Sequence, residues 1–188
     1  MTRLFLDEII QQQTPVTITG EKAHYLSTVL RCRPDDVIIV TDSTGAAFSG
    51  RISAISKKQT TLEIAGPFHQ DNESPLAIKL FQGLLKGEKM DLVIQKATEL
   101  GVTEIVPMIT ERSQVRETRK LQRWQKIAGE ASRQCSRNRI PLIHEPDAFE
   151  TMIAGHNSGK GIICWEQSEA PFSAALDEFK GEKKIILC

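Results

Sequence analysis

The architecture of this protein follows from LAIKLFQGLLKGEKMDLVIQKATELGVTEIVPMI, residues 76 to 109. Its first part, Leu76–Phe81, is rich in apolar residues and predicts a strand, and Ile105–Met108 predicts a second. Between them, from Lys86 to Leu100, apolar residues recur every three or four positions, which predicts a helix that Gly101 ends. A strand, a helix and a strand in this order indicate a mostly parallel sheet with helices on both faces.

The same alternation continues toward the C-terminus. We predict a helix from Leu121 to Cys135, because its apolar residues follow one another at intervals of 3, 4, 3 and 4. A strand and a helix are expected around Ile143 and over 147–153, and further strands at Gly161–Cys164 and Lys184–Leu187. In such α/β folds, ligands bind beyond the carboxyl ends of the strands, so we expect the functional residues there.

The N-terminal part of the chain has a different pattern, typical of a small β-barrel. Its short β-prone runs are Val16–Ile18, Val37–Thr41, Ala47–Ile52 and Thr60–Ile64. One helix is predicted, from Glu21 to Leu30, and Pro34 prevents its continuation. The polar stretch His69–Pro75 is the best candidate linker, so we expect one domain at 1–72 and a second at 76–188.

Composition excludes several classes of protein. Of the 188 residues, 40% are hydrophobic, which is enough for a folded core. No apolar run is long enough to span a membrane, and the N-terminus does not resemble a secretory signal. The cysteines at positions 32, 135, 164 and 188 are not spaced like zinc or redox pairs, so we expect reduced thiols, no metal and a cytoplasmic location.

Positive charge is concentrated in one segment of a chain whose formal net charge is zero. Between Arg112 and Arg139 there are nine Arg or Lys and two Glu, a local charge near +7. From Glu145 to Glu182, eight acidic residues face only two basic ones. This separation favours a polyanionic partner, RNA or DNA, although a solvated helix face would show a similar pattern.

The segment from Gly83 to Lys89 superficially resembles a phosphate-binding loop. Its two glycines are one residue too close, and Met90 follows Lys89 where Ser or Thr is required. The chain also contains no dinucleotide-binding glycine fingerprint. These departures argue against a kinase, an ATPase or a dehydrogenase.

Several short motifs, in order along almost the whole chain, carry a family resemblance. They are RLF at 3–5, HYL at 24–26, VLR at 29–31, KGEKMD at 86–91, QKATELG at 95–101, ERS at 111–113, RWQKI at 123–127 and QCSR at 134–137. On these motifs the chain resembles the bacterial small-subunit ribosomal RNA uracil-N3 methyltransferases of the SPOUT, or trefoil-knot, superfamily.

The resemblance implies a PUA-like β-barrel followed by an α/β SPOUT domain that binds S-adenosylmethionine and works as a homodimer. The substrate would be a uridine of ribosomal RNA, methylated at N3 within an assembled small subunit. The family's cofactor motifs follow the point where this sequence stops, so we expect the knot-forming C-terminal part to be absent and this chain alone to be inactive. We also expect Leu187 and Cys188 to lie at an exposed, unfinished position of the sheet.

Candidate site residues combine the resemblance with the strand ends and the basic segment. For catalysis we favour Arg112 and Arg137 or Arg139, which could stabilise the anion that forms on uracil; an ion pair of Arg112 with Glu111 or Glu99 is the alternative. Glu99 is expected to pair with Lys96. The residues expected to border the cofactor are Trp165, Glu166, Leu187 and Cys188.

Contacts with RNA are expected from cations of both domains, because arginine and lysine bind phosphate. They are Arg31, Arg33, Lys86, Lys89, Arg116, Arg119, Arg123, Lys126 and Arg133. Trp124 lies on an apolar face, so we expect it in the core and not beneath a base. Two other functions stay open: a non-catalytic RNA-binding module, and an α/β enzyme acting on a phosphorylated small molecule.

Overall fold

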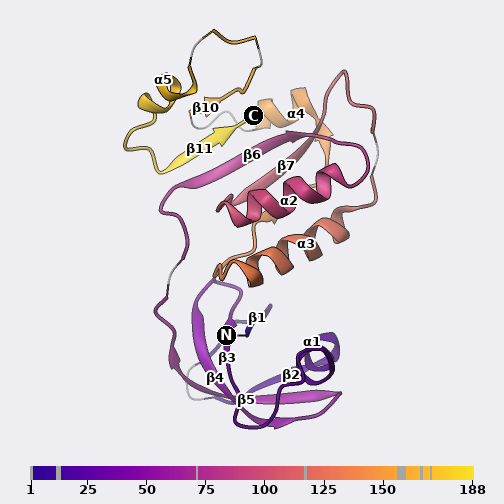
Figure 1. The fold of residues 1–188 in the computed structure, drawn as a ribbon, viewed down its shortest axis with the longest axis vertical. Coiled ribbons are helices and arrows are strands. Elements are labelled where there is room, and N and C mark those ends of the chain that lie inside the picture. The colour runs from indigo at the N-terminus through magenta and orange to yellow at the C-terminus, as the bar shows by residue number, and fades with distance from the viewer. Residues whose placement is uncertain are drawn as a thin grey trace. The chain divides into compact units, whose positions relative to one another are not determined.

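The computed structural model describes residues 2–11, 14–70, 72–116, 118–155, 160–165, 167–169 and 171–188, without the side chains of residues 152 and 153. The chain forms two compact units, Met1–Asn72 and Glu73–Cys188 (Figure 1). None of the helices in these ranges is both long and apolar enough to span a bilayer.

The first unit is built on a five-stranded sheet that has the PUA-like half-barrel form. Its strands are β1 (Arg3–Phe5), β2 (Val16–Thr19), β3 (Val37–Thr41), β4 (Ala47–Ile55) and β5 (Gln59–Pro67), in the order β1-β3-β4-β5-β2. Buried side chains of alternate residues, such as Ile38 and Val40, form its core with Leu26. The four predicted strands are confirmed; β1, which pairs in parallel with β3, was not predicted.

The predicted helix of this unit is present but irregular. It begins as α1 (Gly20–His24) and continues as a π-helical turn over Tyr25–Val29, where the amide of Leu30 bonds the carbonyl of Tyr25 at 2.9 Å. Leu26, in this π-helical turn, is fully buried in the core of the first unit. Arg31 follows with a φ of 54°, a left-handed conformation that ends the helix.

The second unit contains the predicted parallel sheet. Its strands are β6 (Ala77–Gly83), β7 (Glu104–Ile109), β8 (Leu142–Ile143), β9 (Asp147–Ala148), β10 (Gly161–Ile162) and β11 (Lys184–Leu187). The order is β10-β11-β6-β7-β8, and β9 also pairs with β7. All these pairings are parallel, which confirms the α/β class.

The expectation that Leu187 and Cys188 lie at an exposed, unfinished position of the sheet is wrong. β11 lies between β10 and β6, so both of its sides are hydrogen-bonded, and Leu187 and Cys188 are half-buried. The reason is that β10, although only two residues long, pairs with β11 through Gly161 and Ile162.

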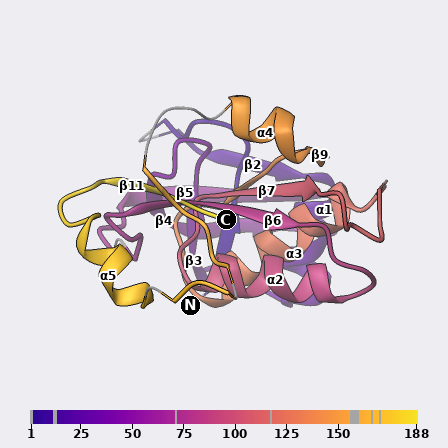
Figure 2. The ribbon, with the colours of Figure 1, turned by 90° about the horizontal axis from the view of Figure 1, so that it is seen from above.

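Helices cover both faces of this sheet. Figure 2 shows α2 (Lys89–Glu99) and α3 (Leu121–Gln134) on one side and α4 (Phe149–Gly155) on the other. Adjacent residues of β7 point to opposite faces of the sheet. Ile105 packs with α2 and α3 on one face, and Val106 belongs to the cluster against which Phe149 of α4 packs on the other. A short helix that was not predicted, α5 (Phe172–Asp177), precedes Phe179, which is buried against Ile162 and Ile185.

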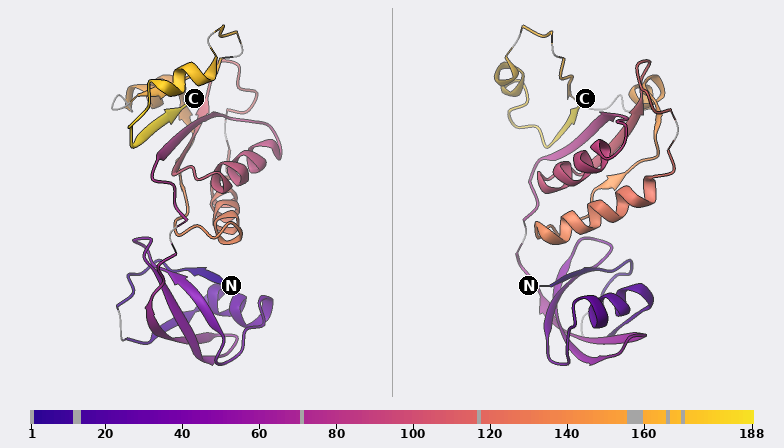
Figure 3. Two further views of the ribbon diagram at one scale, coloured as in Figure 1. Left: turned by 60° about the vertical axis from the view of Figure 1, so that its left-hand side comes forward. Right: turned by 45° about the vertical axis from the view of Figure 1, so that its right-hand side comes forward.

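The helices α2 and α3 pack against each other and run side by side in the views of Figure 3. Trp124 is 1% exposed among Met90, Ile94 and Ile105, which confirms its place in the core. α2 begins at Lys89 and not at Lys86 as predicted. The reason is Gly87, whose φ of 71° forms a turn before the helix.

Candidate active site and RNA interface

The parallel strands β10, β11, β6 and β7 bring their carboxyl ends to one edge of the sheet. The residues that follow these strands therefore lie along one edge of the sheet, which is where we expected the functional residues. Two groups of candidate residues lie at this edge. One follows β7 and contains Arg112, and the other follows β10 and β11.

A tight turn follows β7 and carries Arg112. The amide of Ser113 bonds the carbonyl of Thr110 at 3.0 Å, and the Ser113 hydroxyl accepts the amide of Thr110 at 2.9 Å. Arg112 lies inside this closed turn and is exposed, without an ion pair to any described residue. Glu99, the alternative partner, is bound to Lys96 at 2.7 Å, and the hydrogen bond from Lys96 lowers the pKa of Glu99.

The ends of β10 and β11 are joined by backbone hydrogen bonds. The amide of Cys188 donates to Ile162 at 2.8 Å, and the amide of Cys164 donates to the carbonyl of Cys188 at 2.6 Å. Burial raises the pKa of the Cys188 thiol, and the neighbouring Cys164 raises it further. Trp165 follows and is 58% exposed. Glu166, the fourth residue expected at the cofactor, lies outside the described residues.

Three of the predicted RNA-binding or catalytic arginines form ion pairs with the protein itself. Arg123 bonds Asp91 of α2 at 2.7 Å, and Arg133 bonds Glu130 on its own helix at 2.6 Å. Both retain exposed surface, 59% and 28% of their side chains. Arg137 is different, because only 3% of the residue is exposed.

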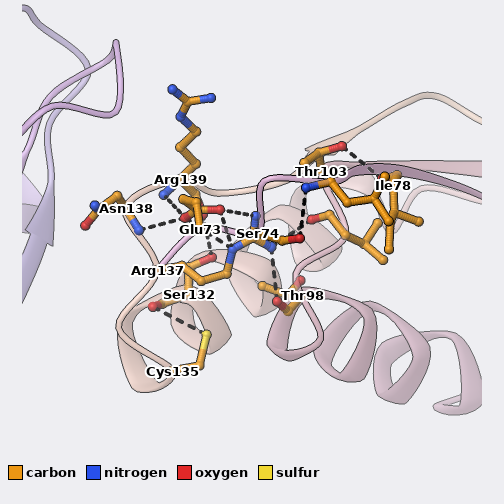
Figure 4. A network of polar contacts seen from close by, with 12 residues as sticks. Glu73, Ser74, Ile78, Thr98, Thr103, Ser132, Cys135, Arg137, Asn138 and Arg139 are labelled. Atoms are coloured by element: carbon orange, nitrogen blue, oxygen red, sulfur yellow. Dashed lines mark hydrogen bonds and ion pairs between the residues drawn. The ribbon is translucent and has the colours of Figure 1, made fainter. Parts of the chain in front are cut away.

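The guanidinium of Arg137 is committed to the interior of the second unit (Figure 4). Its Nη2 donates to Glu73 Oε2 at 2.7 Å, and its Nη1 donates to the carbonyls of Thr98 at 3.0 Å and Val102 at 2.7 Å. These bonds end α2 and fix the chain that follows it. Direct contact of Arg137 with a nucleotide would require breaking these bonds. Arg137 is therefore buried and bonded within the unit, whereas Arg112 is exposed.

Arg139 lies two residues further on, in the same loop, but is exposed. Its amide donates to Glu73 Oε1 at 2.9 Å, while Figure 4 shows its side chain extending away from that carboxylate. Sequence reasoning did not identify Glu73. The only available signal was an acidic residue in a polar linker, which carries no information about a partner 64 positions away.

The remaining cations of the basic segment make no ion pair among the described residues. Arg116 donates to the carbonyl of Glu111 at 3.1 Å, and Lys120 donates to that of Gly87 at 3.2 Å. Among the predicted site residues of the second unit, the exposed cations whose side chains make neither kind of bond to a described group are Lys86, Lys89, Arg112, Arg119, Lys126 and Arg139. Their charge is therefore available to an external anion.

In the first unit, the structure places Arg31 and Arg33 together at the end of the helical segment. Both are exposed, and the amide of Arg33 donates to Asp36 at 2.7 Å, which fixes the backbone here and leaves the guanidinium outside. A cavity of about 640 Å³ also lies in this unit, lined by residues from Leu6 to Lys22. None of the predicted site residues lines it.

Within the described part of the chain, no group of three or more His, Cys, Asp or Glu side chains is arranged to hold a metal ion. The carboxyl edge of the sheet carries exposed arginines in the segment that follows β7 and an exposed indole after β10. Such a surface can bind phosphates and hold a planar base or adenine ring.

Comparison with known proteins gives the same division of the chain. Residues 72–188 match a family model described as an RNA methyltransferase domain, and residues 18–65 match an RNA methyltransferase PUA domain. Ribosomal RNA small subunit methyltransferase E of Buchnera aphidicola is 33% identical over 98% of this chain and 75% of its own length. The Bacillus subtilis protein of that name is 28% identical over 100% and 79%.

Solved structures are similar over the same range. The Neisseria gonorrhoeae ribosomal RNA small subunit methyltransferase E bound to S-adenosyl methionine superimposes with a TM-score of 0.88 at 30% identity, covering 100% of this chain and 79% of its own. A putative methyltransferase of Legionella pneumophila in complex with the same cofactor gives 0.87 at 28% identity, covering 99% and 78%.

Proposed function

The chain belongs to the RNA methyltransferase family whose model matches residues 72–188, and on this premise we propose that it methylates N3 of a uridine in small-subunit ribosomal RNA. Two relatives are named as methyltransferases of that RNA, and two similar structures hold S-adenosylmethionine. S-adenosylmethionine is therefore the proposed methyl donor, and the assembled small subunit the proposed substrate particle. A homodimer in the cytoplasm is the proposed working form.

One observation carries this proposal: the exposed arginine of the turn after β7 and the residues after β10 and β11 lie at the same edge of one parallel sheet. We assign cofactor binding to Trp165, Glu166, Leu187 and Cys188. Of these, the exposed indole and the half-buried Leu187 and Cys188 have the aromatic and apolar surface that an adenine ring requires. When bound, S-adenosylmethionine supplies an electrophilic methyl group on a positively charged sulfur.

The chain's own contribution to the chemistry is charge stabilisation and alignment. Uracil N3 must lose its proton to become nucleophilic, and negative charge then spreads onto O2 and O4. Arg112, exposed and without an ion pair to a described residue, can donate hydrogen bonds to one of these oxygens and stabilise that charge. Holding the base at the correct distance and angle contributes the rest.

RNA binding is assigned to the exposed cations that no described carboxylate neutralises. Among the predicted RNA-binding residues of the second unit these are Lys86, Lys89, Arg116, Arg119 and Lys126, and we add Arg139 after α3. Arg123 and Arg133 keep exposed surface, but we assign them a smaller contribution to RNA binding, because Asp91 and Glu130 already neutralise them. Arg31 and Arg33 would contribute from the first unit.

The first experiment titrates fluorescently labelled small-subunit ribosomal RNA with the 188-residue chain at several salt concentrations. We expect the logarithm of the binding constant to fall linearly with the logarithm of salt, by about 0.7–0.9 for each phosphate contacted. A slope near zero would reject the assignment of these cations to RNA.

The second experiment separates an enzyme from a non-catalytic RNA-binding module. Calorimetry with S-adenosylmethionine measures cofactor binding, and mass spectrometry of digested RNA identifies the methylated nucleoside. Formation of N3-methyluridine in small subunits supports the proposal. RNA binding without cofactor binding or methyl transfer, in this chain and in a form as long as its relatives, would favour the module. That the 188 residues alone are inactive stays a prediction, and the same assay tests it.

A further inference from the structure

The carboxylate of Glu73 binds the loop 137–139 in two ways, through backbone amides of the loop and through the side chain of Arg137. Its Oε1 accepts the amides of Asn138 at 2.8 Å and Arg139 at 2.9 Å, and its Oε2 accepts Arg137 Nη2 at 2.7 Å. Consecutive backbone N–H groups that converge on one carboxylate fix the path of the chain at that point. Ser136, with a φ of 61°, turns the chain into this arrangement.

Arg137 connects the same loop to the end of α2. While Nε and Nη2 grip Glu73, Nη1 bonds the carbonyls of Thr98 and Val102. The side chain of Arg137 is 4% exposed and that of Glu73 is 15% exposed, so this ion pair is shielded from water. Shielding makes the pair rigid, because losing one partner would leave a charge in the interior.

We propose that Glu73 and Arg137 form a positioning pair that directs the Arg139 side chain toward an RNA phosphate. Two arginines that lie two positions apart thereby have different roles. Arg137 points inward and orders the loop, and Arg139 points outward and binds the phosphate. This inference rests on the proposed function, since it needs RNA as the anion. Glu73 is a positioning residue and does not touch the RNA itself.

The positioning role predicts that Glu73→Gln changes RNA affinity in the direction opposite to that expected from charge alone. Replacing Glu73 by Gln removes one negative charge, and charge alone would then strengthen the binding of RNA. If Glu73 orders the loop, Glu73→Gln must instead weaken binding, because Arg139 loses its fixed direction. We expect a loss of affinity of roughly tenfold, comparable to losing one charge-assisted hydrogen bond.

Glu99→Gln is the matched control. It removes the same charge from an i,i+3 pair with Lys96 on α2, and the hydrogen bonds of the Glu99 carboxylate come from Lys96 and Gln95 of that helix and not from the loop. We expect it to bind RNA as tightly as the wild type or more tightly. Equal effects of Glu73→Gln and Glu99→Gln on affinity would overturn the positioning role.

A double-mutant cycle identifies Arg139 as the group through which Glu73 acts. Arg139→Ala should weaken RNA binding and reduce the salt slope by about 0.7–0.9, the contribution of one phosphate contact. In the Arg139→Ala background, Glu73→Gln should have no further effect on affinity. Additive losses would show that Glu73 acts by another route, as general destabilisation would.

The proposal can be tested even if Glu73→Gln fails to fold, because Arg139 is exposed and its truncation leaves the core intact. An Arg139→Ala protein that binds RNA like the wild type would by itself overturn the inference. The proposed function is judged separately, by the salt dependence of the wild-type chain. Salt-dependent RNA binding with an unchanged Arg139→Ala variant would refute only the positioning pair.

Discussion

Asp91, on the first turn of α2, accepts a hydrogen bond from the indole Nε1 of Trp124 on α3 at 3.1 Å. The same carboxylate bonds Arg123 at 2.7 Å, so one acidic residue joins a core contact to the basic surface of the molecule. This relationship links α2 to α3 through a single carboxylate, and it leads to the first prediction.

Asp91→Ala should lower the free energy of unfolding by about 1–3 kcal/mol, because the buried indole N–H would lose its acceptor. Urea denaturation followed by tryptophan fluorescence and by circular dichroism measures this loss. Asp177→Ala, which removes an exposed carboxylate paired with Lys180, is the control and should change stability by less than about 1 kcal/mol. Equal losses in the two variants would contradict the role of Asp91.

Lys126→Ala should weaken RNA binding more than Arg133→Ala does. The two residues lie two turns apart on one face of α3, but Arg133 is already paired with Glu130 at 2.6 Å and Lys126 has no described ion pair. We expect the salt slope to fall by about 0.7–0.9 for Lys126→Ala and by less for Arg133→Ala. The reverse order would show that the internal pair opens on binding.

Arg112→Ala should reduce methyl transfer by about 10²–10³-fold, the usual cost of removing one donor to a developing oxyanion. Its affinity for S-adenosylmethionine should stay unchanged. Single-turnover kinetics, in a form of the protein that transfers methyl groups, and calorimetry measure the two quantities. Arg51→Ala, which removes an arginine from β4 of the first unit, should transfer methyl groups at the wild-type single-turnover rate. An Arg112→Ala protein with wild-type turnover would remove Arg112 from the mechanism.

Glu104 should make the stability of the fold sensitive to acid. Burial raises the pKa of this carboxyl, but hydrogen bonds from Lys79 and His144 outweigh it, and the net pKa is below 4.5. A lowered pKa in the folded state stabilises the protein above the unfolded-state value and loses that contribution as pH falls through the folded-state value.

The measurement is the difference in unfolding free energy between the wild type and Glu104→Gln, taken by urea denaturation at a series of pH values. The difference should be constant near neutral pH and shrink as the pH falls below about 4.5. A pH-independent difference for Glu104→Gln would contradict the depressed pKa.

Local patterns predicted the elements that bury one regular face. The intervals from Leu121 to Cys135 gave α3 to within one residue, and they placed Trp124 correctly in the core. The β-prone runs gave β2 to β5 for the same reason, since alternation along a strand is visible in the sequence. The three-residue β1 and the six-residue α5 are too short to show a period.

The fate of the arginines was the part that local reasoning could not predict. No carboxylate lies within four positions of Arg123 or Arg137 in the sequence, yet Asp91, 32 positions from Arg123, and Glu73, 64 positions from Arg137, are their partners. Both pairs form only because the βαβ connections fold distant segments together. Whether an arginine meets solvent or a buried carboxylate is a property of the tertiary structure, and the charge run in the sequence is the same in either case.

The pairing of β6 with β11 has a consequence for biosynthesis. Ala77 aligns with Lys184, so the middle of this sheet joins two segments made at very different times during translation. Until the later segment leaves the ribosome, β6 has β7 on one side and open hydrogen-bonding groups on the other. Closing so long a loop is slow. Until it closes, the unpaired edge of β6 is prone to aggregation, and chaperones would need to shield it.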